Sequence, residues 1–252
     1  MVRRNGGHYM NIILYGAGGR MGKEVISLVS QSDADTIVAK VDKIAEGCEY
    51  SSLSDFSGEA DVIIDFSHHT LTAEVIAYAI ARELPLVLCT TGHTEEEKAL
   101  IFEAAKSIPV FYSANMSLGV ATLCQLARRT AELFPDADIE IVEAHHNRKL
   151  DAPSGTALMI ADTIKEVRPE AKYVFGRHGM AKRAPEEIGI HSLRCGNEPG
   201  MHEVIISTDY QTLSLKHNAE SRAVFAEGAV SAARFIMNRC AGHYNMYSLV
   251  NN

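Results

Sequence analysis

Residues 11–22 read NIILYGAGGRMG, an apolar run followed by a glycine-rich turn. Apolar side chains then recur at helical spacing, at Met21, Val25 and Leu28. The stretch therefore predicts a strand, a tight turn and a helix. Glycines let a ligand approach the backbone closely, and the start of a helix offers amides and a positive dipole end to a phosphate. A dinucleotide-binding turn is favoured, although the spacing is GxxGxxG, with Met21 in the place of the last glycine of GxGxxG.

The same alternation of strands and helices continues after this turn. The predicted elements are strands at 36–41, 62–64, 84–88 and 110–112, and helices at 70–82 and 95–107. Strands that alternate with helices pair in parallel through right-handed crossovers. The predicted fold class is therefore α/β, with a Rossmann-like doubly wound parallel sheet.

The pattern changes after residue 117, where a second domain is expected. Its predicted elements are helices at 118–133 and 156–167 and strands at 139–144, 190–195, 202–207 and 212–217. Such closely spaced strands predict an open mixed sheet, and a last helix at 222–239 should pack back on the first domain. We expect a disordered extension at 1–9, a dinucleotide-binding domain at 10–117 and 222–252, and a smaller α+β substrate-binding domain at 118–221.

The composition excludes several classes of protein. The chain has 252 residues, of which 46% are hydrophobic and 22% charged, as in an ordinary globular protein. A net charge of -8 disfavours nucleic acid as a partner, and no apolar run is long enough to cross a bilayer. The five cysteines form no CxxC pair, which predicts neither a disulfide framework nor a zinc site and fits reduced thiols in the cytoplasm.

The second predicted strand ends at Asp42 and Lys43. An acid about 20 residues beyond the glycine turn suits the 2′-hydroxyl of an adenosine ribose, so Asp42 favours NADH. Lys43 could instead meet a 2′-phosphate, so dual use with NADPH stays open. Without the glycine turn, solvated loop charges would be the better interpretation of both residues.

Small polar residues follow three later strands, where an open parallel sheet exposes its ligand crevice. Ser67 follows the third strand, a Thr90-Thr91-Gly92 turn the fourth, and Ser113 the fifth. Phe66 could stack on a nicotinamide ring or fill the core, and an isolated phenylalanine more often fills the core.

Residues 143–158 read EAHHNRKLDAPSGTAL and combine reactive side chains with a helix start. Ser154 suits an N-cap position, with Gly155 and Thr156 as the first helical residues, so free amides could bind a carboxylate. Lys149 could add positive charge. We therefore expect a small substrate that carries one or more carboxylates.

His145 and His146 are the candidate proton donors, because an unperturbed imidazole titrates near neutral pH. Metal binding is the rival interpretation. Adjacent residues on a strand point to opposite faces, and no HExxH or cysteine spacing accompanies the pair, so no metal site is predicted. Both rings can face one pocket only if the strand has ended by His145.

These segments resemble the dihydrodipicolinate (4-hydroxy-tetrahydrodipicolinate) reductase family. GAGGRMG at 16–22 is similar to the cofactor turn of that family, and the segment at 143–158 is similar to its most distinctive stretch. Further similar segments are TTG at 90–92, SANMS at 113–117 and HNAESR at 217–222. They follow in the family's order, so the resemblance covers the chain from Met10 onward.

The resemblance implies that NADH or NADPH reduces a cyclic imine dicarboxylate on the diaminopimelate route to lysine, in a cytoplasmic homotetramer that the second domain assembles. It further implies that His145 is the proton donor and Lys149 its cationic partner. His146, Gly155 and Thr156 would then bind the carboxylate. With Lys43 and Phe66 added from the residues themselves, the candidate cofactor-binding residues are Gly16, Ala17, Gly18, Gly19, Arg20, Met21, Asp42, Lys43, Phe66, Cys89, Thr90, Thr91, Ser113, Ala114, Asn115 and Met116.

Three residues depart from the family pattern. Cys89 stands where the family commonly has glycine before TTG, which leaves the shape of the nicotinamide pocket open. Cys195 and Met201 replace a usual glycine and glutamate, and neither is a proposed acid or base.

Two other functions stay open. A different Rossmann enzyme, such as a homoserine or aspartate dehydrogenase, explains the glycine turn but leaves HHNRKLDAPSGT at 145–156 without a role. A nonenzymatic redox sensor that binds NADH needs no proton donor. Its function would survive mutation of His145 and Lys149, whereas that of a reductase would not.

Overall fold

A computed structural model describes residues 9–43 and 47–251. Apart from Tyr9, the extension predicted at 1–9 lies outside the described residues. The described chain divides into two compact units. One runs up to Ser117 and resumes at Arg222, and the other spans Leu118–Ser221.

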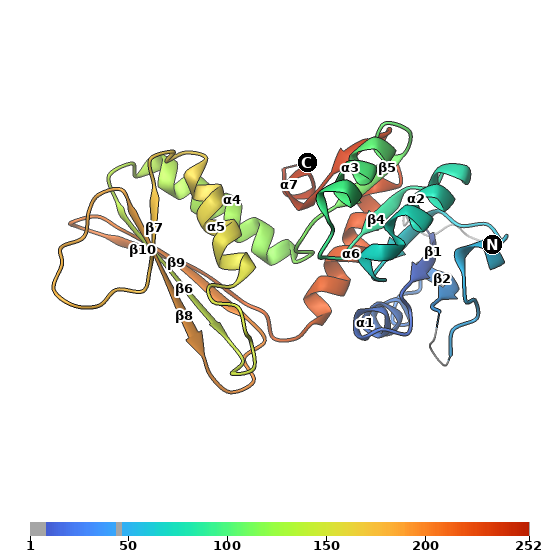
Figure 1. The fold of residues 1–252 in the computed structure, drawn as a ribbon, viewed down its shortest axis with the longest axis horizontal. Coiled ribbons are helices and arrows are strands. Elements are labelled where there is room, and N and C mark those ends of the chain that lie inside the picture. The colour runs from blue at the N-terminus through green and yellow to red at the C-terminus, as the bar shows by residue number, and fades with distance from the viewer. Residues whose placement is uncertain (1–8, 44–46, 252) are drawn as a thin grey trace. The chain divides into compact units, whose positions relative to one another are not determined.

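The first unit is built on a six-stranded parallel sheet with the order β11-β5-β4-β3-β1-β2 (Figure 1). Strand β1 lies between β2 and β3, where the chain switches from one side of the sheet to the other, and ligands bind at such switch points. The elements are β1 (Met10–Tyr15), α1 (Arg20–Val29), β2 (Asp35–Val41), β3 (Val62–Asp65), α2 (Thr72–Ala81), β4 (Leu86–Leu88), α3 (Glu95–Ala104), β5 (Pro109–Tyr112), α6 (Ala223–Ile236), β11 (Gly242–Tyr244) and α7 (Met246–Val250).

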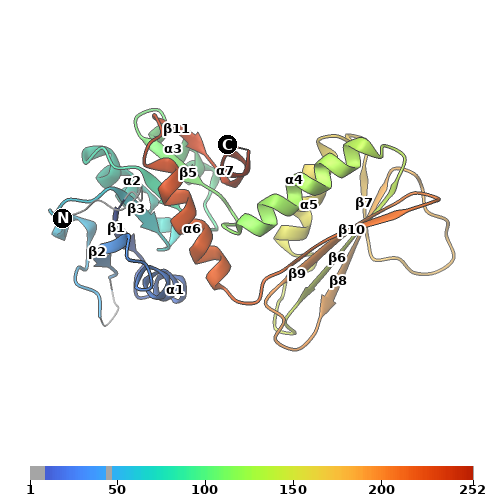
Figure 2. The ribbon, with the colours of Figure 1, turned by 180° about the vertical axis from the view of Figure 1, so that it is seen from behind.

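Helices cover both faces of this sheet. Ile13 and Tyr15 of β1 share an apolar cluster with Val75 of α2 and Ile101 of α3. Helix α6 packs along β3, β4 and β5 and also contacts α1 (Figure 2). Because both faces are covered, consecutive residues of β1 are buried rather than every second one. The doubly wound parallel sheet predicted from the sequence is confirmed.

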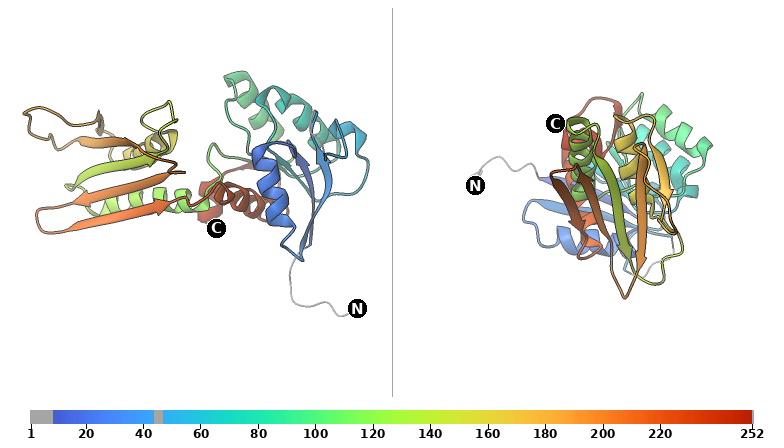
Figure 3. Two further views of the ribbon diagram at one scale, coloured as in Figure 1. Left: turned by 90° about the horizontal axis from the view of Figure 1, so that it is seen from below. Right: turned by 90° about the vertical axis from the view of Figure 1, so that its left-hand side faces the viewer.

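The second unit has a five-stranded mixed sheet with the order β10-β9-β6-β8-β7. Strands β6, β7 and β8 are parallel, whereas β9 runs antiparallel to both β6 and β10. Figure 3 shows these strands side by side in yellow-green to orange. The elements are α4 (Leu118–Leu133), β6 (Asp138–His145), α5 (Gly155–Lys165), β7 (Lys172–Phe175), β8 (Glu187–Arg194), β9 (Met201–Ser207) and β10 (Thr212–Asn218).

Helices α4 and α5 pack together on one face of this second sheet. Ile139 and Ile141 of β6 join a core cluster with Ile160 of α5, whereas the alternate residues Glu140 and Val142 are only partly buried. This period of two is typical of a sheet with a single covered face. The predicted mixed sheet is confirmed.

Several short elements were not predicted from the sequence. Helix α7 has only five residues, too few for a periodic apolar pattern to emerge. Strands β7 and β11 are as short as β3 and β4 but, unlike them, are not buried apolar runs. Several predicted boundaries were wrong, among them the end of the helix predicted at 95–107, which ends at Ala104. The strand predicted at 190–195 begins earlier, at Glu187, and the helix predicted at 222–239 ends at Ile236.

Candidate active site

The glycine-rich turn after β1 packs too closely on its surroundings to accept side chains at Gly16 and Gly22. Gly16 has a φ of 79°, and a Cβ built on it would lie 2.5 Å from the backbone of Phe66. A Cβ on Gly22 would lie 2.3 Å from the Gly16 carbonyl oxygen. The Gly19 amide donates to that oxygen at 3.1 Å and closes the turn. Gly19 is also the N-cap of α1 and provides no side-chain cap, which suits a helix start that binds an anion.

Asp42 and Lys43 follow β2 beside this turn. Asp42 Oδ2 accepts a hydrogen bond from the Gly18 amide at 3.1 Å. Lys43 Nζ lies 3.5 Å from Glu74 Oε2, and the Tyr15 hydroxyl donates to the other oxygen of Glu74 at 3.1 Å. The positive charge of Lys43 is therefore partly offset by Glu74.

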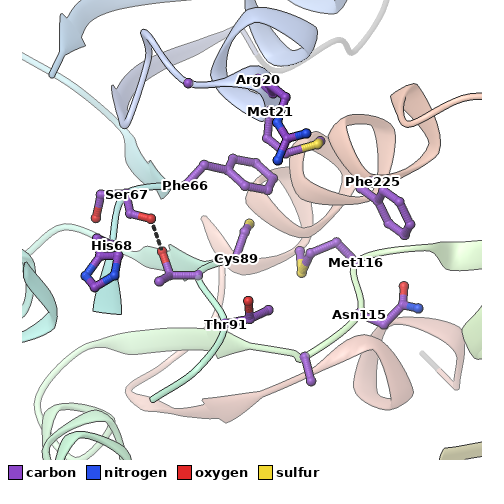
Figure 4. A pocket seen from close by; sticks show the side chains of 13 residues that line it. Arg20, Met21, Phe66, Ser67, His68, Cys89, Thr91, Asn115, Met116 and Phe225 are labelled. Carbon is purple, nitrogen blue, oxygen red and sulfur yellow. Dashed lines mark hydrogen bonds between the residues drawn. The ribbon is translucent and has the colours of Figure 1, made fainter. Parts of the chain in front are cut away.

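A cavity of about 540 Å³ opens at the carboxyl ends of the strands of the first unit (Figure 4). Phe66 and Cys89 point toward its middle. Phe66, for which the sequence left core and ligand contact open, is thus a cavity residue. Ten of the candidate cofactor-binding residues line the cavity: Gly19, Arg20, Met21, Phe66, Cys89, Thr90, Thr91, Ala114, Asn115 and Met116.

Ser67, His68 and Phe225 complete the lining, and of these neither His68 nor Phe225 was predicted from the sequence as a site residue. Phe225 belongs to α6, where helical spacing alone assigns it to packing. The Ser113 hydroxyl donates to the Asn115 carbonyl oxygen at 2.9 Å and shapes the loop after β5. Six candidates, found in the turn or beside the strands, do not line the cavity: Gly16, Ala17, Gly18, Asp42, Lys43 and Ser113.

Asp65, buried at the end of β3, joins two strand ends of this cavity. Its carboxylate accepts from the Ser67 amide at 2.9 Å and from the Thr90 hydroxyl at 3.0 Å. Burial raises the pKa of Asp65, and these hydrogen bonds act in the opposite direction. Burial also raises the pKa of the neighbouring Cys89 thiol well above its ordinary value. Cys89 is therefore a neutral group that packs against the cavity rather than a reactive thiolate.

In the second unit, His145 is the last residue of β6 and is held by a buried carboxylate. Its Nδ1 lies 2.6 Å from Oε2 of Glu143, two residues earlier on the same face of the strand. The Arg194 guanidinium donates to both oxygens of Glu143, at 2.7 and 2.8 Å. Burial would raise the pKa of Glu143, but the hydrogen bonds from Arg194 and His145 outweigh it and lower that pKa to about 2. Glu143 is therefore ionised at neutral pH.

Lys149 and His146 lie in the segment that follows β6. Strand β6 ends at His145, so His146 lies in the loop that follows it. The Lys149 amide donates to the His146 carbonyl oxygen at 3.1 Å. Lys149 Nζ pairs with Asp151 at 2.9 Å, and the Asp151 carbonyl oxygen accepts from Arg194 at 2.7 Å. Arg194 thus links this segment to the carboxylate that holds His145.

The start of α5 is capped as the sequence predicted. Ser154 is the N-cap, and its hydroxyl accepts from the Ala157 amide at 3.1 Å. The amides of Gly155 and Thr156 lie in the first turn of α5, before the Ala157 amide that bonds to Ser154. A Cβ built on Gly155 would lie in open space. The Ser154 hydroxyl also lies 3.0 Å from His202 Nε2.

Three further residues near His145 were not predicted as parts of the site: Glu143, Arg194 and His202. The spacing E-x-H on a strand could have indicated Glu143, because residues two apart share a face. Arg194 is opposite His145 in the β6–β8 register, which sequence periodicity cannot reveal. Burial and the charge of nearby His145 lower the pKa of His202 to about 4, so His202 is neutral at pH 7.

Neither unit offers an obvious metal centre. Among residues 9–43 and 47–251, no group of three or more histidine, cysteine or acidic side chains could hold a metal ion. All five cysteines are free thiols. Over the same residues, every helix is too short or too polar to span a membrane.

Two family models match the chain and together cover most of it. The model described as dihydrodipicolinate reductase, N-terminus, matches residues 10–116, and the one described as dihydrodipicolinate reductase, C-terminus, matches residues 119–250. The first range lies within the leading segment of the first unit. The second range covers the second unit and the returning segment of the first unit.

Curated relatives and a solved structure are similar over nearly the full length. The 4-hydroxy-tetrahydrodipicolinate reductase of Caldanaerobacter subterraneus subsp. tengcongensis is 45% identical, over 96% of this chain and 98% of the relative. That of Clostridium tetani is 42% identical with the same coverage. A dipicolinate-bound dihydrodipicolinate reductase from Paenisporosarcina sp. TG-14 has a TM-score of 0.81 and 24% identity, covering 94% of this chain and 97% of that chain, and shows the same fold.

Proposed function

Because the chain belongs to the dihydrodipicolinate reductase family, we propose that it reduces 4-hydroxy-tetrahydrodipicolinate with a nicotinamide cofactor on the diaminopimelate route to lysine. The observation that carries this function is the arrangement around β6 and α5. A histidine held by an ionised carboxylate and a capped helix start are joined there through Glu143. A proton donor next to a carboxylate-binding helix start suits a cyclic imine dicarboxylate.

His145 is the proposed proton donor. When bound, the nicotinamide supplies a hydride to a ring carbon of the substrate, so negative charge would develop on the conjugated imine unless a proton arrives. His145 can provide that proton from Nε2, because Nδ1 faces the Glu143 carboxylate. Gly200 lies beside Nε2, and a Cβ built on this glycine would come within 3.2 Å of that nitrogen.

Lys149, His146 and the first amides of α5 are the proposed carboxylate-binding groups. Lys149 pairs with Asp151, whose side chain is 59% exposed, so a substrate carboxylate can compete for the ammonium group. The amides of Gly155 and Thr156 stand at the positive end of the α5 dipole. One of the similar structures is a dipicolinate complex, and dipicolinate is a cyclic dicarboxylate of this kind.

The residues of the first unit fit a dinucleotide. The tightly packed glycine turn leads into the start of α1 at the cavity edge, where a pyrophosphate would meet the backbone amides of that helix start. We propose that NADH is preferred over NADPH. A 2′-phosphate beside Asp42 would meet that carboxylate and Glu74, which already pairs with Lys43.

We also propose that the protein is a homotetramer in the cytoplasm, assembled through the second unit. The face of its sheet opposite α4 and α5 carries Leu193, which is half exposed. An apolar side chain on an uncovered sheet face suits contact with another copy. Size-exclusion chromatography with light scattering measures the mass of the protein in solution, and a monomeric mass would contradict this assembly.

The decisive experiment is oxidation of NADH and NADPH by the pure protein, with substrate generated in place from pyruvate and aspartate semialdehyde by a dihydrodipicolinate synthase. We expect rapid oxidation that requires both precursors, and a faster rate with NADH. Protein that binds NADH but oxidises neither cofactor would contradict the proposed reaction. A faster rate with NADPH would contradict only the role given to Asp42 and Glu74.

A further inference from the structure

Glu143 forms hydrogen bonds with two residues besides His145, namely Ser154 and Arg194. Its side chain is fully buried, and its two oxygens accept four hydrogen bonds. Oε2 faces His145 Nδ1 at 2.6 Å, and Oε1 accepts from the Ser154 amide at 3.1 Å. Arg194 bonds to both oxygens. One carboxylate therefore contacts both the imidazole and the residue that caps α5.

The charge of this carboxylate determines which ring nitrogen of His145 carries hydrogen. An ionised carboxylate can only accept hydrogen bonds, so Nδ1 of His145 must be the donor. In the neutral ring, Nε2 then carries no hydrogen. His145 must first take up a proton from solvent at Nε2, and the resulting imidazolium donates that proton to the ligand from the same nitrogen. Arg194 offsets the negative charge, so Glu143 can stay buried.

We propose that Glu143 is a positioning residue for the reaction, an inference that rests on the proposed function. Its carboxylate holds His145 in the Nδ1–H tautomer, which leaves Nε2 for the substrate. It also anchors Ser154, so the proton donor and the carboxylate-binding start of α5 keep a constant separation. Glu143 itself touches neither substrate nor cofactor.

The same strand contains a matched control. Glu140 also contacts a histidine and an arginine, because His191 Nε2 lies 2.7 Å from its carboxylate and Arg183 pairs with it. The Glu140 side chain is 28% exposed, and its hydrogen bonds go to Arg183 and His191 rather than to the start of α5. Replacement of Glu140 therefore measures how much kcat changes when a carboxylate is removed from this sheet without an effect on His145.

The first test is the tautomer of His145 in the wild-type protein, which needs no variant to fold. Nitrogen-15 NMR at a pH that keeps the ring neutral distinguishes a protonated Nδ1 from a protonated Nε2. We expect hydrogen on Nδ1, and assign the signal by its loss in His145→Ala. Hydrogen on Nε2 would overturn the proposal, whether or not the protein reduces its substrate.

The second test compares Glu143→Gln with Glu140→Gln. A glutamine at 143 keeps the size but offers one acceptor oxygen, so His145 or Arg194 loses its partner. We expect kcat to fall about 10- to 100-fold, as is usual when an orienting partner is lost, with the KM for NADH unchanged and mixed His145 tautomers in the NMR spectrum. Glu140→Gln should retain kcat and the Nδ1–H tautomer.

Three outcomes would overturn the positioning role. They are a kcat of Glu143→Gln within about twofold of wild type, an unchanged tautomer in that variant, and an equal loss of kcat in Glu140→Gln. If Glu143→Gln does not fold, Arg194→Lys replaces it, because a lysine lacks the planar fork that pairs with both carboxylate oxygens, and the same loss of kcat and of a single tautomer is expected. A wild-type protein that oxidises no cofactor would instead refute the proposed function and leave the tautomer result standing.

Discussion

The glycine turn at 16–22 and the turn at 151–156 both lead into a helix, but different interactions hold them. The first turn is held mainly by backbone packing, because Cβ atoms on Gly16 and Gly22 would overlap neighbouring backbone atoms. The second turn is held by side chains. Glu143 accepts from the Ser154 amide, and Arg194 donates to the Asp151 carbonyl oxygen.

The difference separates two uses of glycine. In the first turn, glycine is required by the fold itself, so the turn forms before any ligand arrives. In the second turn, Gly155 has open space where a side chain would be, and ionisable groups fix the geometry around it. We therefore expect mutations in the first turn to affect stability, and mutations in the second to affect chemistry and pH dependence.

The largest effect should follow from removing the proposed acid. We expect His145→Ala to lower kcat by about 10²- to 10⁴-fold, the usual contribution of a general acid. NADH affinity, measured by fluorescence titration, should be unchanged. His191→Ala, which removes the histidine beside Glu140, is the matched control and should retain kcat. A near-normal rate for His145→Ala would refute its assignment.

Gly22→Ala should destabilise the first unit. Its Cβ would lie 2.3 Å from the Gly16 carbonyl oxygen and 2.6 Å from Ala17 Cα, and backbone atoms cannot move aside as a flexible side chain can. We expect a loss of about 3 kcal/mol or more in the free energy of unfolding, measured by urea denaturation. Unchanged stability would show that the turn is looser than its packing indicates.

Acid should weaken the second turn through His202. Its folded pKa is about 4, below the ordinary 6.5, so the unfolded chain binds the proton first as the pH falls. Stability is therefore lost between pH 6.5 and 4, and His202 accounts for roughly 2–3 kcal/mol of that loss. His93, His217 and His243 also have lowered pKa values, so the contribution of His202 to the pH dependence is isolated only by comparing the wild-type protein with a His202 variant.

The variant for this comparison is His202→Gln, which keeps a hydrogen-bonding group near Ser154. Urea denaturation of both proteins from pH 7 to pH 4 should show a shallower decline for the variant. Parallel curves would contradict the lowered pKa of His202. Below pH 4.5 both proteins should lose further stability, because the Glu143 pKa of about 2 lies below its ordinary value.

Gly155→Ala should have the smallest effect on stability. Nothing lies within 4 Å of the added methyl group, and alanine is favoured over glycine in a helix, so stability should rise by less than about 1 kcal/mol. Dipicolinate affinity, measured by calorimetry, should fall about tenfold, because the methyl group would enter the space proposed for a carboxylate. Unchanged affinity would place that carboxylate elsewhere.

The long helices of the fold were predictable, whereas some of the short elements were not. Helices α4 and α6 have enough residues for apolar periodicity, and strand β1 is a continuous apolar run. Strand β11 has three residues and joins the first sheet only by pairing with β5, far away in sequence. No local pattern carries that information.

Residue types and their order along the chain were enough to predict the dinucleotide-binding fold, the capped helix start at Ser154 and the histidine pair. These features depend on local backbone chemistry, which nearby residues dictate. Only the tertiary structure placed Arg194 beside Glu143, because strand register brings together residues that are 51 positions apart. The Arg194 hydrogen bonds that lower the pKa of Glu143 and the burial that lowers the pKa of His202 both depend on packing between strands and a helix, and no local stretch of sequence contains them.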